Sequence, residues 1–252
     1  MTMIPTLQFG WLTVSTYTAL LDLGLLLSLG VLAWRARRRV ARPGRWVDAA
    51  LVALVAGIAG GRLGYVVAHA GYYDQHRDEI LRFWLGGLSW HGALAGVLVA
   101  LPLYCRLRGL RFWRLADELA LVAPLIGAAG WLGCLAAGCA YGRPSAGPDW
   151  LLADLPDIFG VWALRPNVQL LGAMGSLLLL PLLGVVHRGR RPGMTAALFL
   201  VLYGAGLAWL SSLRGDAIPL WAGRRPDVWL NGLVAVGGLV TLGRQALRSR
   251  WS

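Results

Sequence analysis

The stretch Asp117–Pro144, DELALVAPLIGAAGWLGCLAAGCAYGRP, combines the two features that decide how this chain folds. Most of it is apolar, and the run is long enough to cross a bilayer, which takes about 20 residues in a helix. Its end, Gly130–Pro144, is dense in glycine, which lets another backbone come close. This end also carries Trp131, Cys134 and Arg143. The stretch therefore predicts a membrane helix whose end is either a tight packing contact or part of a functional site.

The whole chain has the composition of a membrane protein. Of its 252 residues, 57% are hydrophobic and 14% are charged, whereas a soluble domain carries about 25% charged residues. Arginine supplies all 24 basic side chains and gives a net charge of +12. Such an excess is also typical of nucleic-acid-binding proteins, but here it lies in short loops between apolar runs, so we expect no nucleic-acid partner. Three cysteines imply no disulfide framework.

Seven apolar runs predict an all-α integral membrane protein with seven transmembrane helices in a single polytopic domain, residues 1–252. Sixteen arginines fall in one set of alternating loops and seven in the other. Because positively charged loops stay in the cytoplasm, this asymmetry predicts that the N-terminus is outside and the C-terminus is cytoplasmic. The predicted spans are residues 11–34, 47–69, 84–104, 116–138, 167–187, 194–213 and 227–243.

Polar side chains inside the predicted spans are candidate functional residues, because placing them in a bilayer is costly. At 1.5 Å per residue, three of them lie roughly 10 Å below the predicted outer surface: Arg62, His91 and Trp131. Tyr17 lies at a similar depth, and the shallower polar residues near the same face are Cys134, Gln169 and Asn231. We expect this layer of polar groups to open to the outside.

Each of these residues also has a purely structural interpretation. Arg62 can extend its guanidinium to the outer headgroups, and His91 can be a core histidine bonded to a carbonyl. Trp131 can fill space between helices, and Gln169 and Asn231 can bridge helices. The two cysteines of the stretch have a C-x4-C spacing, unlike the CxxC of redox and zinc sites, which predicts small buried residues.

An arginine and a histidine in a lipid-accessible cavity suit chemistry on a phospholipid headgroup. Arginine binds phosphate through its planar fork, and histidine moves protons near neutral pH. The sequence has no HExxH motif, no P-loop and no nucleophile elbow, which argues against a metalloprotease, an ATP-driven transporter and a serine hydrolase. We expect no metal and no cofactor. A small-molecule transporter is not favoured, because no paired broken helices are evident.

Five segments, in order along most of the chain, resemble the prolipoprotein diacylglyceryl transferase family. They cover its arginine-containing second span, its histidine-containing third span, its signature region, the motif before its fifth span and its sixth span. The matching segments are Gly60–Val66 (GGRLGYV), Phe83–Val97 (FWLGGLSWHGALAGV), Asp117–Pro144, Arg165–Leu170 (RPNVQL), and Leu202–Gly204 (LYG) with Arg214.

The resemblance implies a multi-pass enzyme of the bacterial plasma membrane. Such an enzyme transfers the diacylglyceryl group of phosphatidylglycerol to the lipobox cysteine thiol of a preprolipoprotein, and glycerol phosphate leaves. His91 would lie near the thiol proton, and an arginine would lie on the departing phosphate. From the polar layer and the resemblance together, we expect the substrate-binding residues to be Arg62, Arg143, Arg214, Tyr17, Tyr203, Gln169, Trp131, Cys134 and Gly142.

The chain departs from the family pattern at several polar positions. Where the signature reads Gly-Arg-x-Gly-Asn, this chain has Gly130–Cys134, GWLGC, with tryptophan for arginine and cysteine for asparagine. A cysteine-rich version, GC-x-x-x-GC-x-YG, occurs in a subgroup and accommodates Cys139. Leu207 and Ser211 stand where the sixth span carries arginine and glutamate, and Leu171–Gly172 stands where the fifth carries Tyr-Glu. The alternative function is therefore that of a catalytically impaired member that binds lipids or lipoproteins.

Overall fold

The computed structural model describes residues 6–9, 12–40, 42–83, 86–148, 150–188 and 191–247. Within these ranges, seven helices are long and apolar enough to cross a membrane, which confirms the prediction of a seven-span, all-α membrane protein. They are α1 (Thr16–Arg39), α2 (Gly44–Ala68), α4 (Trp90–Arg108), α5 (Phe112–Ala137), α6 (Val168–His187), α7 (Met194–Leu213) and α8 (Pro226–Leu247).

The orientation of the termini stays a prediction. Three of the arginines behind it, Arg190, Arg248 and Arg250, lie outside the described residues, as do residues 11, 84 and 85 at the starts of two predicted spans.

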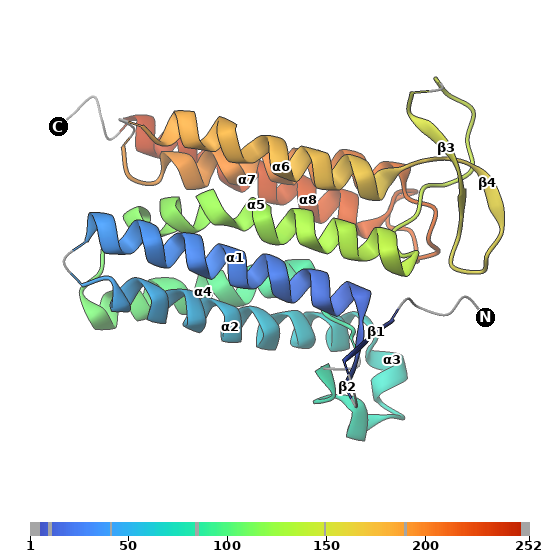
Figure 1. Cartoon of the computed structure of the whole chain (residues 1–252), viewed down its shortest axis with the longest axis horizontal. Coiled ribbons are helices and arrows are strands. Elements are labelled where there is room, and N and C mark those ends of the chain that lie inside the picture. Colours follow the sequence, from blue (N-terminus) through green and yellow to red (C-terminus); the bar gives the residue numbers. More distant parts are fainter. Residues whose placement is uncertain are drawn as a thin grey trace. The chain divides into compact units, whose positions relative to one another are not determined.

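Short elements connect the spans. β1 and β2 form an antiparallel pair before α1, and α3 and the 3-10 helix η1 follow α2. β3 and β4 form an antiparallel hairpin between α5 and α6, drawn in yellow in Figure 1. The bounds are β1 (Thr6–Phe9), β2 (Leu12–Ser15), α3 (Ala70–Tyr73), η1 (Arg77–Glu79), β3 (Leu152–Pro156) and β4 (Trp162–Pro166).

Two spans begin later than predicted, which corrects the depths assigned to His91 and Tyr17. α1 begins at Thr16 because the residues just before it form β2. α4 begins at Trp90 because the two preceding glycines have φ values of 95° and 72°, which a right-handed helix excludes. The Ser89 side chain then caps α4 by accepting a hydrogen bond from the helix backbone at 3.3 Å. Tyr17 and His91 are each the second residue of a helix, rather than about 10 Å along it.

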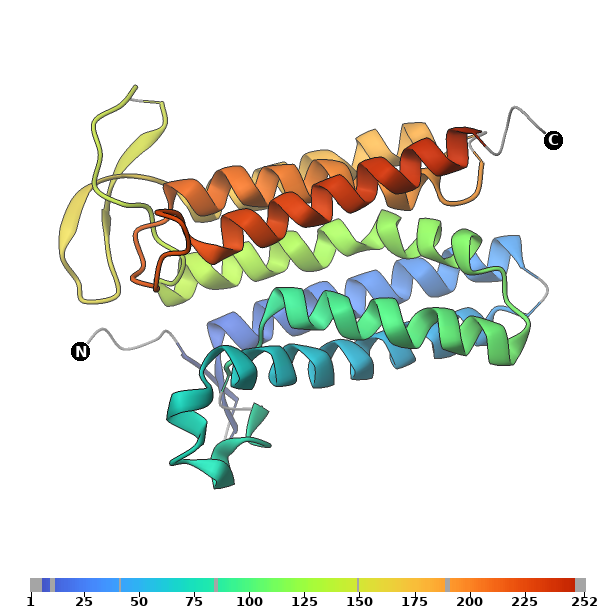
Figure 2. The same cartoon turned by 180° about the vertical axis from the view of Figure 1, so that it is seen from behind.

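The chain divides into two compact units, Met1–Val31 with Ala116–Ser252 and Leu32–Leu115. The prediction of a single domain stays a prediction. In the smaller unit, α2 lies along α4, and Figure 2 shows the two ribbons side by side. A Cβ on Gly92 would overlap the backbone of Gly60. Close helix packing therefore accounts for the glycines around Arg62 and His91.

In the larger unit, α7 packs against α6 and α8. A Cβ on Gly204 of α7 would lie 2.8 Å from a backbone nitrogen of α8, so the two helices approach closely. Leu121 of α5, Leu183 of α6 and Phe199 of α7 form part of the buried core. The part of α1 up to Val31 also belongs to this unit, and its Ser28 hydroxyl donates to a carbonyl of α5 at 3.1 Å.

Candidate functional site

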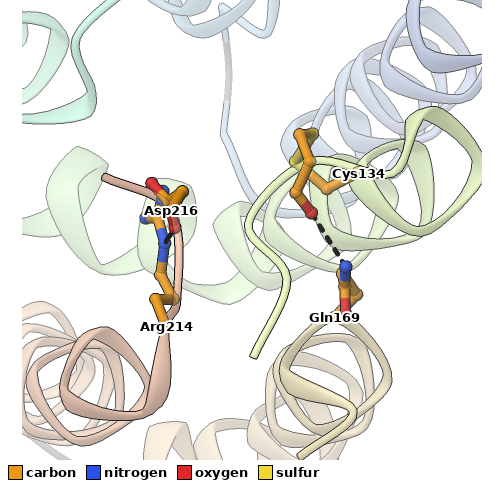
Figure 3. Close-up of a disulfide and its surroundings, with 5 residues drawn as sticks. Cys134, Gln169, Arg214 and Asp216 are labelled. Atoms are coloured by element: carbon orange, nitrogen blue, oxygen red, sulfur yellow. Dashed lines mark hydrogen bonds and ion pairs between the residues drawn. A yellow bond between two sulfur atoms is a disulfide. The ribbon is translucent and has the colours of Figure 1, made fainter. Parts of the chain in front are cut away.

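A disulfide closes the glycine-rich end of α5. The helix ends at Ala137, and Gly138 has a φ of 69°, the left-handed conformation that commonly ends a helix. The Cys139 backbone N–H then donates to the Cys134 carbonyl at 3.0 Å, and the two side chains form a disulfide (Figure 3). The prediction of small buried cysteines without a disulfide is therefore wrong, because the turn brings their Cα atoms to 4.7 Å, within disulfide range.

Three of the predicted site residues gather around this end of α5. Gln169 bridges α6 to it by donating from Nε2 to the Cys139 carbonyl at 2.9 Å. The buried Oε1 of Gln169 has no hydrogen-bond partner among the described residues. Tyr17 of α1 lies against Gly133, where a Cβ would come within 2.8 Å of its ring. Trp131 lies against α6.

Trp131 contacts Gly172, and the two residues are both departures from the family pattern. A Cβ on Gly172 would overlap the indole ring of Trp131. The largest side chain thus stands at the arginine position and the smallest at the glutamate position, and they fit each other. This contact supports the packing interpretation of Trp131; a role in substrate binding stays a prediction.

The backbone beyond the disulfide pairs with the backbone beyond α7. Gly142 forms an antiparallel bridge with Arg214, and the Arg143 N–H donates to the Leu213 carbonyl at 2.9 Å. Gly142 is buried beneath Pro166, where a Cβ would overlap the Pro166 carbonyl, so a residue without a side chain is required here. The bridge brings Arg143 and Arg214, two of the predicted phosphate ligands, to one place.

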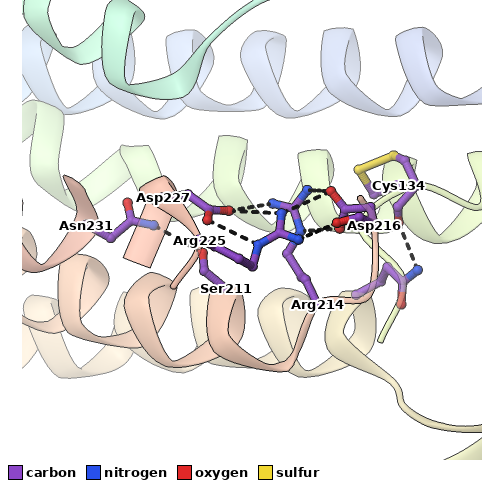
Figure 4. A network of polar contacts seen from close by, with 9 residues as sticks. Cys134, Ser211, Arg214, Asp216, Arg225, Asp227 and Asn231 are labelled. Atoms are coloured by element: carbon purple, nitrogen blue, oxygen red, sulfur yellow. Dashed lines mark hydrogen bonds and ion pairs between the residues drawn. A yellow bond between two sulfur atoms is a disulfide. The ribbon is translucent and has the colours of Figure 1, made fainter. Parts of the chain in front are cut away.

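Two arginines and two aspartates form an ion-pair network beside this bridge (Figure 4). Arg214 holds Asp216 through two donors at 2.7 and 2.8 Å and reaches Asp227 at 3.4 Å. Arg225 contacts Asp216 at 3.0 Å and Asp227 at 3.2 Å. Burial alone would raise the pKa of Asp216, but the ion pairs with Arg214 and Arg225 hold that pKa below its usual value.

A cavity of about 670 Å³ opens beside the network. The side chains of Arg143 and Arg224 make no hydrogen bond or ion pair within the described residues, and both are exposed. Arg224 and Arg225 were not among the predicted ligands, and the only signal for them was the run of charge just before α8. The lining residues are Arg143, Ser212, Arg214, Asp216, Ala217, Ile218, Leu220, Gly223, Arg224, Arg225 and Val228.

Arg62, in the smaller unit, holds a loop. Its guanidinium has five N–H donors, and four carbonyl acceptors surround it at 2.6–3.1 Å. The side chain is only 8% exposed. Four of its donors are engaged by the loop that leads to α4, which favours a structural role for Arg62; its binding of the lipid phosphate stays a prediction. The acceptors belong to Glu79, Ile80, Gly86 and Gly87.

His91 and Tyr203 occupy different settings. His91 is half-buried in the first turn of α4, and its role in proton transfer stays a prediction. Tyr203 stacks on Phe199 in the helix core, with ring centroids 5.1 Å apart, and its hydroxyl lies over Gly127. Within the described ranges, no group of three or more His, Cys, Asp or Glu residues is placed to hold a metal ion.

Arg165 is a positioning residue that the sequence analysis missed. It is 2% exposed, and it donates to the Leu155 and Gly142 carbonyls at 3.0 and 3.2 Å and to Asp157 at 3.2 Å. Hydrogen bonds from the hairpin backbone, chiefly from the Val161 N–H, lower the pKa of Asp157. Arg165 thus fastens the β3–β4 hairpin to the bridge at Gly142.

Comparisons with known proteins extend over nearly the whole chain. The family model described as prolipoprotein diacylglyceryl transferase matches residues 5–243. The phosphatidylglycerol–prolipoprotein diacylglyceryl transferase of Symbiobacterium thermophilum is 35% identical over 94% of this chain and 90% of that protein. The proteins of the same name from Thermosynechococcus vestitus and Bordetella avium are 29% and 35% identical, over 85% and 76% of this chain and 82% and 74% of those proteins.

Proposed function

The chain belongs to the prolipoprotein diacylglyceryl transferase family, and on this premise we propose that it transfers the diacylglyceryl group of phosphatidylglycerol to the lipobox cysteine of preprolipoproteins. It works as a multi-pass protein of the bacterial plasma membrane. Its partners are phosphatidylglycerol, the preprolipoprotein signal peptide and the surrounding lipids. One observation carries the proposal: the family match runs through all seven membrane-length helices found in the described residues.

In this reaction the substrate supplies the nucleophile. The thiol sulfur bonds to the glyceryl carbon that carries the phosphate ester, and the thiol proton is taken up by a base. The carbon–oxygen bond breaks, its electron pair goes to the oxygen, and glycerol phosphate departs. The protein must therefore supply a proton acceptor and a cation for the phosphate. The disulfide between Cys134 and Cys139 fits this scheme, because neither cysteine is needed as a nucleophile.

We assign the uptake of the thiol proton to His91 and the binding of the lipid phosphate to Arg143 and Arg214. The support for the two arginines is the cavity that both line. Asp216 holds Arg214 through two short hydrogen bonds, so the guanidinium is oriented before substrate arrives. Its Nη1 contacts Asp227 only at 3.4 Å, a long and weak bond, and this is the donor most easily shared with a phosphate oxygen.

A second function is lipid or lipoprotein binding without transfer. It is favoured by the side chains at the positions where this chain differs from the family pattern. Trp131 packs on Gly172, and Ser211 accepts a hydrogen bond from Asn231 at 3.3 Å. Trp131, Gly172 and Ser211 stand where the family pattern carries charged groups. Stabilisers of that kind commonly contribute about 3–4 kcal/mol each to the transition state.

Mass spectrometry of a lipobox peptide, incubated with phosphatidylglycerol and membranes containing the full chain, tests the proposal. We expect a product heavier by one diacylglyceryl group and an equal amount of glycerol phosphate. Arg143→Ala and Arg214→Ala should lower the rate, whereas Arg77→Ala, which changes an exposed arginine on η1, should not. A wild-type protein that binds phosphatidylglycerol vesicles but yields no product, and does not rescue a transferase-depleted bacterium, would support the second function instead.

A further inference from the structure

The cavity beside the ion-pair network contains two kinds of arginine. Arg214 and Arg225 are paired with two aspartates, Asp216 and Asp227, so their charges are cancelled (Figure 4). Two further arginines line the same cavity, and no described carboxylate pairs with either of them. The cavity therefore presents two positive charges that the protein itself does not neutralise.

A tight turn presents the first of these charges, Arg224. Trp221 and Arg224 exchange backbone hydrogen bonds at 2.8 and 3.1 Å, and the two residues between them, Ala222 and Gly223, have φ values of 48° and 73°. Two positive φ values in succession are typical of a type I′ turn. The Trp229 indole donates to the Trp221 carbonyl at 3.1 Å and ties the turn to α8. The guanidinium of Arg224 takes no part in these contacts.

The second charge, Arg143, follows Gly142, the residue that forms the backbone bridge with Arg214. Its backbone is fixed by the hydrogen bond to Leu213 at 2.9 Å, and the Gly215 N–H next to it donates to the Tyr141 carbonyl at 2.8 Å. Both uncancelled arginines are thus held by their backbones while their side chains stay available. Apolar residues complete the lining, namely Ala217, Ile218, Leu220 and Val228.

We propose that this cavity is a site for a phosphate dianion, and that Arg224 and Arg143 select the dianion over the monoanion. A phosphomonoester carries about −1.5 to −2 charges at pH 7, which matches two uncancelled arginines, each able to bind phosphate in a bidentate manner. A phospholipid diester carries a single charge. Rupture of the carbon–oxygen bond converts a diester into a monoester, so the site fits the leaving group better than the bound lipid. Such preferential binding lowers the barrier.

The ligand's identity, glycerol phosphate, rests on the proposed function, whereas the phosphate site does not. The direct measurement uses the full chain in nanodiscs of phosphatidylcholine, titrated with inorganic phosphate or glycerol phosphate and followed calorimetrically at constant ionic strength. We expect Arg224→Ala to weaken binding of both by about tenfold or more, and Arg77→Ala to leave it unchanged. A parallel series in nanodiscs containing phosphatidylglycerol measures whether the cavity binds the phosphate of the lipid headgroup.

The outcomes separate the inference from the proposed function. If the protein binds phosphate but transfers no diacylglyceryl group, the phosphate site is supported and the proposed reaction is refuted. If it transfers the group but neither binds phosphate nor is inhibited by it, the reaction is supported and the phosphate site is refuted. An equal loss for phosphatidylglycerol and for phosphate in Arg224→Ala would make the lipid headgroup the ligand and overturn dianion selection. Unchanged phosphate binding in Arg224→Ala would overturn the role of Arg224. Two controls exclude misfolding. Arg224→Gln removes the charge but keeps a long polar side chain, and the melting temperature of each variant, measured without phosphate, should equal that of the wild type.

Discussion

The contact between Trp131 and Gly172 predicts a stability effect with a definite sign and size. Alanine at position 172 would place its Cβ inside the indole ring, so either the ring or α6 must move. Overpacking of this kind costs about 1–3 kcal/mol. The same change at an open helical position stabilises by up to about 1 kcal/mol, because alanine has the higher helix propensity.

Removing the ring reverses the effect. Trp131→Ala alone leaves a cavity between α5 and α6 and should lower the free energy of unfolding by about 3–5 kcal/mol. In that background Gly172→Ala has room for its methyl group and should be neutral or stabilising. The double-mutant cycle should therefore give a coupling energy of about 1–4 kcal/mol between the two sites.

Detergent-denaturant unfolding of the four proteins measures this coupling. Gly175→Ala is the matched control, because it lies on the same helix and a Cβ there meets nothing within 4 Å. It should cost nothing with or without Trp131. Additive effects of Trp131→Ala and Gly172→Ala, or a Gly172→Ala variant as stable as the Gly175→Ala variant, would refute the packing argument.

Four further outcomes are expected. His91→Ala should insert normally but transfer about 10²–10⁴-fold more slowly; a loss of only a few-fold would remove His91 from the mechanism. A reporter fused after residue 252 should read cytoplasmic and one within 145–160 external, and the opposite pattern would reverse the predicted orientation. Cys134 and Cys139 should resist alkylation until a reductant is added, and labelling of both without one would contradict the disulfide. Because the pKa of Asp216 is lowered, its ion pairs stabilise the fold above the ordinary aspartate pKa of about 4, and this stabilisation is lost as pH falls through the lowered value. Asp216→Asn should therefore flatten the fall of the melting temperature in acid, and an unchanged fall would exclude a contribution from Asp216.

The seven spans were predictable from hydrophobic patterning because a long apolar run has few folded solutions in a bilayer other than a helix. Motif order was equally informative, since the family resemblance depended on short segments read in sequence. The first residue of each helix was harder to predict from the sequence. The glycines before Trp90 are visible in the sequence, but their left-handed conformation, which moves His91 to the first turn of α4, is a property of the folded loop.

The sequence by itself determined which residues carry charge, and only the tertiary structure decided which charges remain available. Arg62 and Arg143 look alike as candidates, yet loop carbonyls engage the donors of one while the other lines a cavity. Arg214 meets Gly142 through a backbone bridge between segments far apart in the chain. Hydrophobic periodicity reports the environment of a residue's own helix, whereas hydrogen-bond partners and ion pairs arise where distant segments meet, and no local pattern encodes that meeting.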